Sequence, residues 1–238
     1  MLLKLLLLQF CAHLLADFVF QNQKMSDGKK IKAFSLSHLG HFFIVWGCAY
    51  FLALDFNFLL VSFFIAILHL IGDVSKSWLS QKFIGKSFFF TDQVFHLLVI
   101  ISACWFYIQT SGLNQWWYVS IKTVTVITGF ILCAKPANII ILHLFMSFGI
   151  PTPDEKGTES EDISLPNAGK LIGIVERTLA LSLILINQFA AVGLIIAAKS
   201  ILRFKSNQKS EYVLVGTLLS FAIATLCGIL INMILVSV

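Results

Sequence analysis

The sequence contains few charged residues and none of the motifs of several large enzyme classes. Charged side chains make up 12% of the 238 residues, against roughly 25% in ordinary soluble domains. The sequence holds no P-loop, no glycine fingerprint of a dinucleotide-binding fold, no HExxH and no serine nucleophile elbow. Nucleotide-binding, metalloprotease and serine hydrolase functions therefore lose their usual sequence support.

The cysteines and the net charge argue against two further classes. The five cysteines are scattered, odd in number and form no CxxC, so they predict no disulfide framework. The net charge is +5, but the basic residues fall in short loops between apolar runs. In such loops they set membrane topology rather than form a patch for nucleic acid. We expect no nucleic acid partner.

Apolar residues, in contrast, are abundant. They account for 58% of the chain, and phenylalanine alone occurs 23 times. This composition predicts an all-α polytopic membrane protein with about seven spans, in a range of six to eight. We expect residues 1–110 to form a four-helix transmembrane bundle. Residues 111–238 are expected to form a C-terminal transmembrane region with an acidic loop at 151–168, in which 169–204 is either one long helix or a hairpin.

Acids and imidazoles recur inside the first four hydrophobic segments. Ionisable side chains at membrane depth cost at least about 2.5 kcal/mol each on insertion scales, so they are rare and mostly functional. Three pairs place an aspartate and a histidine four residues apart, and one places two histidines three apart, so each pair shares a helical face. The pairs are His13 and Asp17, His38 and His41, His69 and Asp73, and Asp92 and His96.

The predicted topology brings these four pairs to a similar depth. The loop at 23–33 carries four lysines against one aspartate, and Lys76, Lys82 and Lys86 follow the third segment. The excess of lysine predicts that both loops are cytoplasmic. At about 1.5 Å rise per residue, all four pairs then lie near the cytoplasmic side. An antiparallel four-helix bundle can bring them to one site.

Imidazoles and carboxylates repeated on facing helices would supply four or more ligands for one or two divalent ions, with zinc as the expected metal. The expected ligands are His13, Asp17, His38, His41, His69, Asp73, Asp92 and His96. Two other interpretations stay open: a metal-free pathway for protons or ions, and hydrogen bonding that only holds the helices together. His38 and His41 lie near a helix start, where each could equally face the lipid headgroups.

Three more polar residues adjoin the pairs. Gln21 continues the first pair by one helical turn and Gln93 follows Asp92, so both are expected to contact ligands or substrate. Lys76 lies one turn beyond Asp73 and could bind a lipid phosphate, although extension toward the interface is the usual behaviour of such a lysine.

The second half of the chain has its own embedded charges. Glu176, Arg177 and Lys199 form either an intramembrane ion-pair network or an anchor for an anionic headgroup, because the guanidinium fork fits phosphate. His143 is alone in an apolar run and is interpreted as a packed core residue. Asp55 is expected to cap a turn.

The whole chain resembles a family of bacterial integral membrane proteins of unknown function. The matching stretches are His13 to Phe18 with Gln21, His69 to Asp73 with Lys76, Asp92 to His96, Gly173 to Arg177, Gln188 to Gly193, Ala198 to Ser200 with Arg203, and Glu211 to Thr217. This resemblance implies a multi-pass protein of the bacterial cytoplasmic membrane and implies nothing about activity.

The repeated His-x3-Asp pattern of the first hundred residues is also similar to the zinc-dependent phospholipase C and P1 nuclease superfamily and its membrane-bound metal-dependent hydrolases. That likeness implies a zinc cluster held by helices and cleavage of phosphoesters. The soluble enzymes also use an N-terminal amine and further ligands that have no assigned counterpart in this sequence, so phosphoester chemistry rests on the partial pattern alone.

Together these features predict a metal-dependent hydrolase that cleaves a phosphoester in a membrane lipid or similar amphiphile on the cytoplasmic side. Its nucleophile would be a metal-bound water, with Asp17, Asp73 or Asp92 as general base. The alternative is a transporter or channel that binds cations or relays protons through the same residues. That alternative needs a second polar path to the outer face, for which the third and fourth segments offer few residues. A membrane scaffold, the third hypothesis, leaves the clustered charges unexplained.

Overall fold

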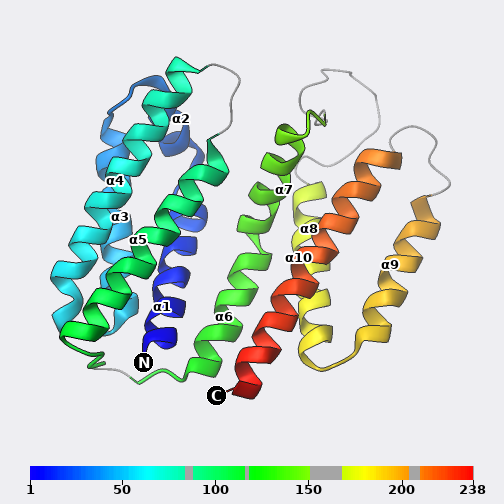
Figure 1. Ribbon diagram of the computed structural model, residues 1–238. Helices are drawn as coiled ribbons and strands as arrows, with labels where there is room; N and C mark the ends of the chain where they lie inside the picture. The colour runs from blue at the N-terminus through cyan, green and yellow to red at the C-terminus, as the bar shows by residue number, and fades with distance from the viewer. Residues whose placement is uncertain (84–87, 116–117, 151–167, 204–209, 238) are drawn as a thin grey trace. The chain divides into compact units, whose positions relative to one another are not determined.

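The computed structural model describes residues 1–83, 88–115, 118–150, 168–203 and 210–237, and within these ranges all regular structure is helical (Figure 1). The predicted all-α class is therefore confirmed. The chain divides into two compact units, Met1–Thr128 and Gly129–Val238. The division falls within helix α6 (Ile121–Cys133). Each unit is described separately below.

The first unit is an antiparallel bundle of four long helices. It contains α1 (Leu2–Leu14), α3 (Leu36–Ala53), α4 (Leu59–Lys82) and α5 (Phe89–Thr110). Helix α1 contacts α3 and α5, and α4 contacts the same two helices, so the four close a ring (Figure 1). The short helix α2 (Gln23–Ile31) joins the first two members at one end and packs on α3 and α4.

Local sequence signals explain where these helices begin and end. Asn22 accepts a hydrogen bond from the backbone N–H of Met25 and caps α2. Ser35 and His38 form a reciprocal capping box at the start of α3. As expected, Asp55 caps the turn after α3, where it accepts a hydrogen bond from the backbone N–H of Asn57 at the 3-10 helix η2 (Phe56–Phe58).

An apolar core fills the end of this bundle that lies away from α2. It contains Leu5, Ala53, Phe58, Ile65, Ile100, Cys104 and Tyr107. The hydroxyl of Tyr107 and the backbone N–H of Asn114 both donate to the buried carboxylate of Asp55, at 2.7 Å each. These bonds tie the loop after α5 to the turn after α3, so this end of the bundle is tightly closed.

Five helical segments are long and apolar enough to cross a membrane: Leu2–Phe20, Leu36–Ala53, Phe56–Lys82, Phe89–Thr110 and Leu214–Ser237. Helices α6 and α7 (Lys135–Ser147) together make a sixth if the 46° bend between them is one broken span. Large apolar side chains such as Phe51, Phe64 and Trp105 are exposed on the outside of the bundle, as lipid-facing residues are. A membrane protein is thus supported, and seven spans stay a prediction.

The second unit contains α7, α8 (Ala168–Leu185), α9 (Phe189–Arg203) and α10 (Ser210–Ser237). Helix α8 packs on α7, α9 and α10. The described part of the predicted stretch 169–204, which ends at Arg203, is a helical hairpin, since α8 and α9 run antiparallel on either side of a turn (Figure 1) in which Asn187 adopts a φ of 59°. Asparagine tolerates this left-handed conformation better than most residues. The acidic loop predicted at 151–168 falls, except for Ala168, outside the described residues.

Candidate metal centre

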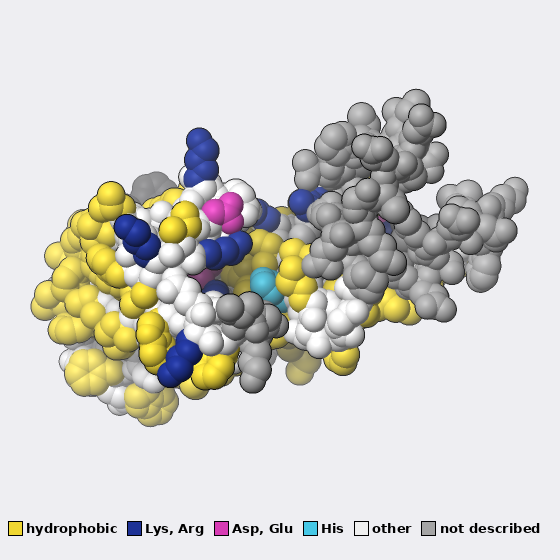
Figure 2. Space-filling model, turned by 90° about the horizontal axis from the view of Figure 1, so that it is seen from above, with side chains coloured by type: hydrophobic (Ala, Val, Ile, Leu, Met, Phe, Trp, Pro, Cys, Tyr) yellow, Lys and Arg dark blue, Asp and Glu magenta, His cyan; other side chains and the backbone are white. Residues whose placement is uncertain are grey.

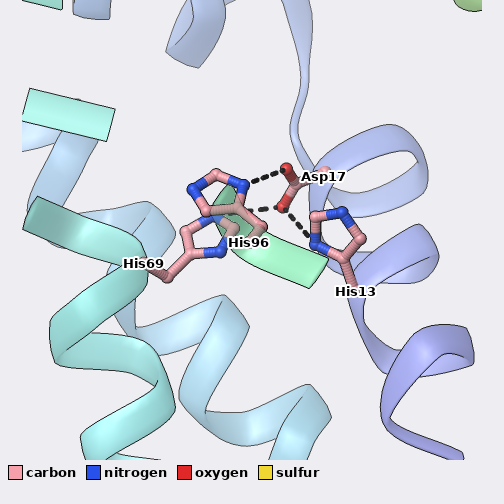
Figure 3. Close-up of side chains that lie close together, drawn as sticks. All are labelled: His13, Asp17, His69 and His96. Carbon is pink, nitrogen blue, oxygen red and sulfur yellow. Dashed lines mark ion pairs between the residues drawn. The ribbon is translucent and has the colours of Figure 1, made fainter. Parts of the chain in front are cut away.

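Asp17 lies at the centre of a cluster of imidazoles inside the first unit. Its Oδ1 is 3.2 Å from Nε2 of His41, 3.3 Å from Nε2 of His69 and 3.7 Å from Nδ1 of His13, while its Oδ2 is 3.8 Å from Nδ1 of His96. Figure 3 shows the ring of His13 on one side of the carboxylate and those of His69 and His96 on the other. Four helical segments thus direct nitrogen atoms at one carboxylate.

The backbone around Asp17 is unusual. Residues Leu15–Phe20 form a π-helix, η1, which continues α1 and ends where Gln21 donates its N–H to the carbonyl of Ala16 at 3.1 Å. A π-helical turn inserts an extra residue into the helix and occurs most often at functional sites. Here the wider turn carries the carboxylate that the other ligands surround.

Two further carboxylates border this centre, and each is paired with a lysine. Oδ2 of Asp73 accepts a hydrogen bond from Lys29 at 2.5 Å and lies 3.8 and 3.9 Å from the imidazoles of His41 and His69. Oδ2 of Asp92 accepts one from Lys76 at 2.7 Å. The second carboxylate oxygen of Asp92 lies 3.6 Å from Nε2 of His96.

Three overlapping groups in the described chain bring ligand atoms within 4.8 Å of one another, close enough to hold a metal ion. They are His13, Asp17, His69 and His96; His41, His69 and Asp73; and Asp73, Asp92 and His96. Seven of the eight predicted ligands are in these groups. Neutral imidazole with carboxylate is a donor set that suits Zn²⁺ and related ions.

Several buried polar atoms of the cluster have no hydrogen-bond partner among the described residues. Such atoms indicate whether the site could accommodate a metal ion. Oδ1 of Asp17, Oδ1 of Asp92, Nδ1 of His41 and both ring nitrogens of His96 are buried without a hydrogen-bond partner among the described residues. Buried polar atoms are nearly always paired, so a group of unpaired ones calls for a ligand. Asp17 and His96 belong to the first ligand group, and Asp92 and His96 to the third, so the donor set fits a bound cation.

The charges at the site also leave room for a cation. The three carboxylates of Asp17, Asp73 and Asp92 face two ammonium groups, those of Lys29 and Lys76. Three negative charges against two positive ones leave one in excess when every imidazole is neutral. Uncompensated charge in a membrane interior is costly. Either a metal ion or a protonated imidazole can compensate this excess negative charge.

His38 is the eighth predicted ligand, and the structure places it apart from the three groups. Its Nδ1 lies 3.0 Å from the hydroxyl of Ser35 and its Nε2 lies 3.0 Å from that of Ser77. Both ring nitrogens therefore have partners in capping and packing. His41, one turn further along α3, points into the cluster instead. Of the two predicted ligands, His41 is in the ligand groups of the described chain and His38 is not.

The two glutamines contact the site as second-layer partners. The side-chain oxygen of Gln93 lies 3.1 Å from Nε2 of His13, and that of Gln21 accepts a hydrogen bond from Lys29 at 2.8 Å. Contacts of this kind orient a ligand or a charged neighbour. A direct substrate role for Gln21, Gln93 or Lys76 stays a prediction.

Lys29 is the residue that sequence reasoning missed. It belongs to a run of lysines that was interpreted only as a marker of the cytoplasmic side, yet its side chain is buried and reaches Asp73 from α2. The available signal was Asn22, a good N-cap ahead of the run, which predicts a helix with one face turned to the bundle. The neighbouring lysine, Lys30, points outward and forms an ion pair with Asp27. Hydrogen bonds from Lys30 and from Gln23 lower the pKa of the Asp27 carboxyl.

The charged residues of the second half lie in the second unit. Glu176 forms an ion pair with Lys199 across the hairpin of α8 and α9. Arg177 is fully buried and donates to the carbonyls of Cys133 and Ala134, to the side-chain oxygen of Asn138 and to the hydroxyl of Ser220. Glu176 and Lys199 therefore form the kind of ion pair that one of the two sequence interpretations predicted. Contact of the three charged residues with a substrate stays a prediction.

An apolar groove runs between α4 and α5 on the outside of the first unit. Its volume is about 830 Å³, and its lining includes Leu60, Phe64, Leu68, Phe95 and Phe106. It adjoins the cluster at one end, because Leu68 precedes His69 and the ring centroid of Phe95 lies 5.9 Å from that of His96. A hydrocarbon chain is the kind of ligand that such a lining accepts.

The fold and this centre define a helical membrane protein with a polar, ligand-rich interior in its N-terminal bundle. A family model described as "Protein of unknown function (DUF3307)" matches residues 5–128, slightly more than half of the chain. The protein therefore belongs to this family. The matched range covers nearly all of the first unit and every residue of the cluster.

No curated protein and no solved structure matches the chain. The similarity to the zinc-dependent phospholipase C and P1 nuclease superfamily therefore finds no support in these comparisons. The resemblance of residues 173–217 to the membrane protein family likewise lies outside the matched range.

Proposed function

We propose that the first unit binds a divalent metal ion, zinc, and that the protein is an integral hydrolase of the bacterial cytoplasmic membrane that cleaves a phosphoester in an amphiphilic substrate. The observation that carries the proposal is the convergence of Asp17 with His13, His69 and His96, whose ligand atoms lie within 4.8 Å of one another. Several of these atoms have no hydrogen-bond partner. Three helical segments, α1 with η1, α4 and α5, contribute the four side chains.

The two lysines favour one of the three ligand groups and a single ion. The other two groups both use Asp73, whose Oδ2 already accepts a hydrogen bond from Lys29, and the third also uses Asp92, which is bonded to Lys76. An ammonium group repels a metal ion and competes with it for the carboxylate. Among the described residues, Asp17 forms its ion pairs with imidazoles and with no lysine, so the first ion is assigned there.

Closure of the bundle on the far side favours an enzyme over a transporter. The end away from α2 is filled by the apolar core around Leu5, Phe58 and Ile100 and tied by the buried Asp55. A transported cation would need polar groups along that half. The cluster instead lies next to the basic α2 end and next to the groove between α4 and α5, which an amphiphile could reach from the lipid.

A zinc ion at this centre would activate water and stabilise negative charge that develops on a phosphoryl oxygen. The chain's own residues would divide the remaining work. Asp17 and the imidazoles would hold the ion, Gln93 would orient His13, and Asp92, whose Oδ1 accepts no hydrogen bond from the described residues, would accept a proton. The groove beside Phe95 and His96 would receive the hydrocarbon chain of the substrate.

The test is the metal content of protein purified in detergent without chelators, measured by mass spectrometry. We expect about one zinc ion per chain in the wild type, loss of the ion in Asp17→Asn, and retention in Asp27→Asn. Asp27 is an exposed aspartate of the same unit and provides the matched control. Circular dichroism would show that each variant is folded.

A folded wild-type protein without stoichiometric metal, also after incubation with zinc, would contradict the metal centre and with it the hydrolase. If zinc is bound, release of phosphate from detergent-solubilised phosphatidic acid and isoprenoid phosphates provides the activity measurement. Zinc-dependent release that Asp17→Asn abolishes would support the reaction class.

A further inference from the structure

Lys29 and Lys76 share an arrangement that membrane topology alone does not explain. Each extends an ammonium group to a carboxylate that borders the metal centre, Lys29 to Asp73 and Lys76 to Asp92. They come from different elements, α2 and α4. Lysines that only mark the cytoplasmic side extend into water or toward lipid headgroups, and several neighbours of these two do so.

We infer that Lys29 and Lys76 form an anion subsite that receives the phosphoryl group of the substrate beside the metal centre. This inference rests on the proposed function and specifies its substrate class: an ester with an exposed, negatively charged phosphate. The ammonium groups have hydrogen-bond capacity for such a ligand. A lysine has three N–H donors; Lys76 uses one of them on Asp92, and Lys29 uses two, on Asp73 and Gln21.

The two lysines differ in access, which suggests an order of contact. The side chain of Lys76 is 33% exposed, whereas that of Lys29 is 10% exposed. An incoming phosphate therefore meets Lys76 first. Lys29 lies deeper, held by Gln21 from the end of the π-helical segment that also carries Asp17. The anion subsite and the metal centre are thus connected through one short stretch of chain.

The surface above the cluster has the charge that an anionic ligand requires. Lys24, Lys32 and Lys82 are exposed around it, whereas the charge of Lys30 is offset by its ion pair with Asp27. Figure 2, which looks onto the face that carries α2, shows the basic side chains spread over that face. A predominantly positive entrance attracts anions and repels cations. It suits a phosphorylated substrate and is unfavourable for a path that conducts metal ions.

Phosphate on a lipid headgroup and phosphate on a soluble ester share this chemistry, so the experiment has one arm for each. Inorganic phosphate and dioctanoyl phosphatidic acid are titrated separately into the zinc-loaded full-length protein in detergent, with binding measured by calorimetry. Dioctanoyl phosphatidylcholine, which lacks an exposed phosphate monoester, is the lipid control. Tighter binding of phosphatidic acid than of inorganic phosphate identifies a lipid source, and equal binding identifies the phosphate group alone.

The variants are Lys29→Met and Lys76→Met, with Lys30→Met as the matched control. Lys30 lies next to Lys29 on α2, but its side chain is 71% exposed and bonds only Asp27 among the described residues. Loss of a hydrogen bond to a charged ligand corresponds to about a tenfold lower affinity. We expect that loss in both test variants for both probes, and wild-type affinity in the control.

Zinc content is measured on the same samples, so that a failure of the metal-centre hypothesis can be distinguished from a failure of the anion-subsite hypothesis. Lys29→Met leaves Asp73 without its partner and could impair folding, which is why Lys76→Met and the charge-preserving Lys29→Arg accompany it. Lysine variants that keep zinc and bind phosphate like the wild type would overturn the anion subsite, as would a zinc-loaded wild type that binds neither probe. A metal-free protein that binds phosphate through both lysines would overturn the metal centre and support the subsite.

Discussion

The imidazole rings of His69 and His96 stack face to face between α4 and α5, with centroids 3.7 Å apart and an interplanar angle of 16°. Two protonated rings would repel each other strongly at this separation in a membrane interior. The stack therefore disfavours protonation of both rings at once, and neutral imidazole is the form in which histidine binds a metal. Both residues belong to the ligand group that contains Asp17, so the stack places two nitrogen ligands from neighbouring helices at one centre.

The first prediction separates ligand histidines from the histidine that caps a helix. His69→Gln and His96→Gln are each expected to lower zinc affinity by at least tenfold, since even partners outside the ligand shell contribute about 10–100-fold. His38→Gln should leave the affinity unchanged, because both ring nitrogens of His38 are bonded to serines. Competition with a chromogenic zinc chelator measures this, and an equal loss in all three variants would contradict the assignment.

The sequence was sufficient to predict the helical bundle and the meeting of its His/Asp pairs. Spacings of three and four residues fix which side chains share a helical face, and the loop charges fix which helix ends lie together. The π-helical turn at Asp17 and the stacking of His69 on His96 were not predictable, because they depend on packing between helices. The distinction between His38 and His41 depends on Ser77, a residue 39 positions away from His38.

The second prediction concerns Gly72, which lets α5 approach α4 beside the cluster. A Cβ atom at Gly72 would lie 2.8 Å from the ring of Phe95 and 3.0 Å from Nε2 of His96. Gly72→Ala should therefore lower the free energy of unfolding by about 1–3 kcal/mol and weaken zinc binding by displacing His96. Thermal unfolding in detergent, with and without added zinc, measures both effects.

Gly47, in the middle of α3, is the matched control, because a Cβ there meets no atom within 4 Å. Gly47→Ala should raise stability by about 0.5–1 kcal/mol through the better helix propensity of alanine. If the two alanine variants behaved alike, the close approach of Phe95 and His96 to α4 would not be a determinant of the site.

Lys29 shows where prediction from sequence reached its limit. Four lysines in a short polar loop indicate topology, but nothing in their spacing indicates which of them is buried. That depends on the packing of α2 against α3 and α4, where a Cβ atom at Gly28 would lie 2.3 Å from the hydroxyl of Ser37. The number of spans stays a prediction: among the described residues five helices qualify by length and composition, or six with the bent pair α6 and α7, and the short apolar α9 is not among them.

The third prediction distinguishes the hydrolase from a cation transporter. The apolar core around Ile65 and Cys104 closes the bundle on the side away from α2, so protein reconstituted into vesicles should give no zinc or proton flux above that of empty vesicles. A fluorescent zinc indicator and a pH indicator inside the vesicles report the two fluxes. Flux that depends on Asp17 would favour the transporter.

The fourth prediction concerns Arg177, which holds the break between α6 and α7. Cys133 ends one helix, Ala134 lies in the break, and their carbonyls accept hydrogen bonds from the guanidinium at 2.6 and 3.1 Å. Arg177→Leu should lower the free energy of unfolding by about 2–4 kcal/mol, because several buried acceptors lose their donor. Arg177→Lys should recover only part of this loss, since one ammonium cannot reproduce the planar fork.

Thr178 provides the control for Arg177 on the same helix. Within the described part of the chain its hydroxyl bonds only carbonyls of α8 itself, so Thr178→Ala should change stability by less than about 0.5 kcal/mol. Thermal unfolding measures the stability of each variant, and zinc content is measured in parallel. The Arg177 variants should retain their zinc as long as they are folded, because all proposed metal ligands lie in the first unit. Zinc loss in a folded Arg177→Lys variant would instead show that Arg177 acts on the centre, and its structural role would then be incomplete.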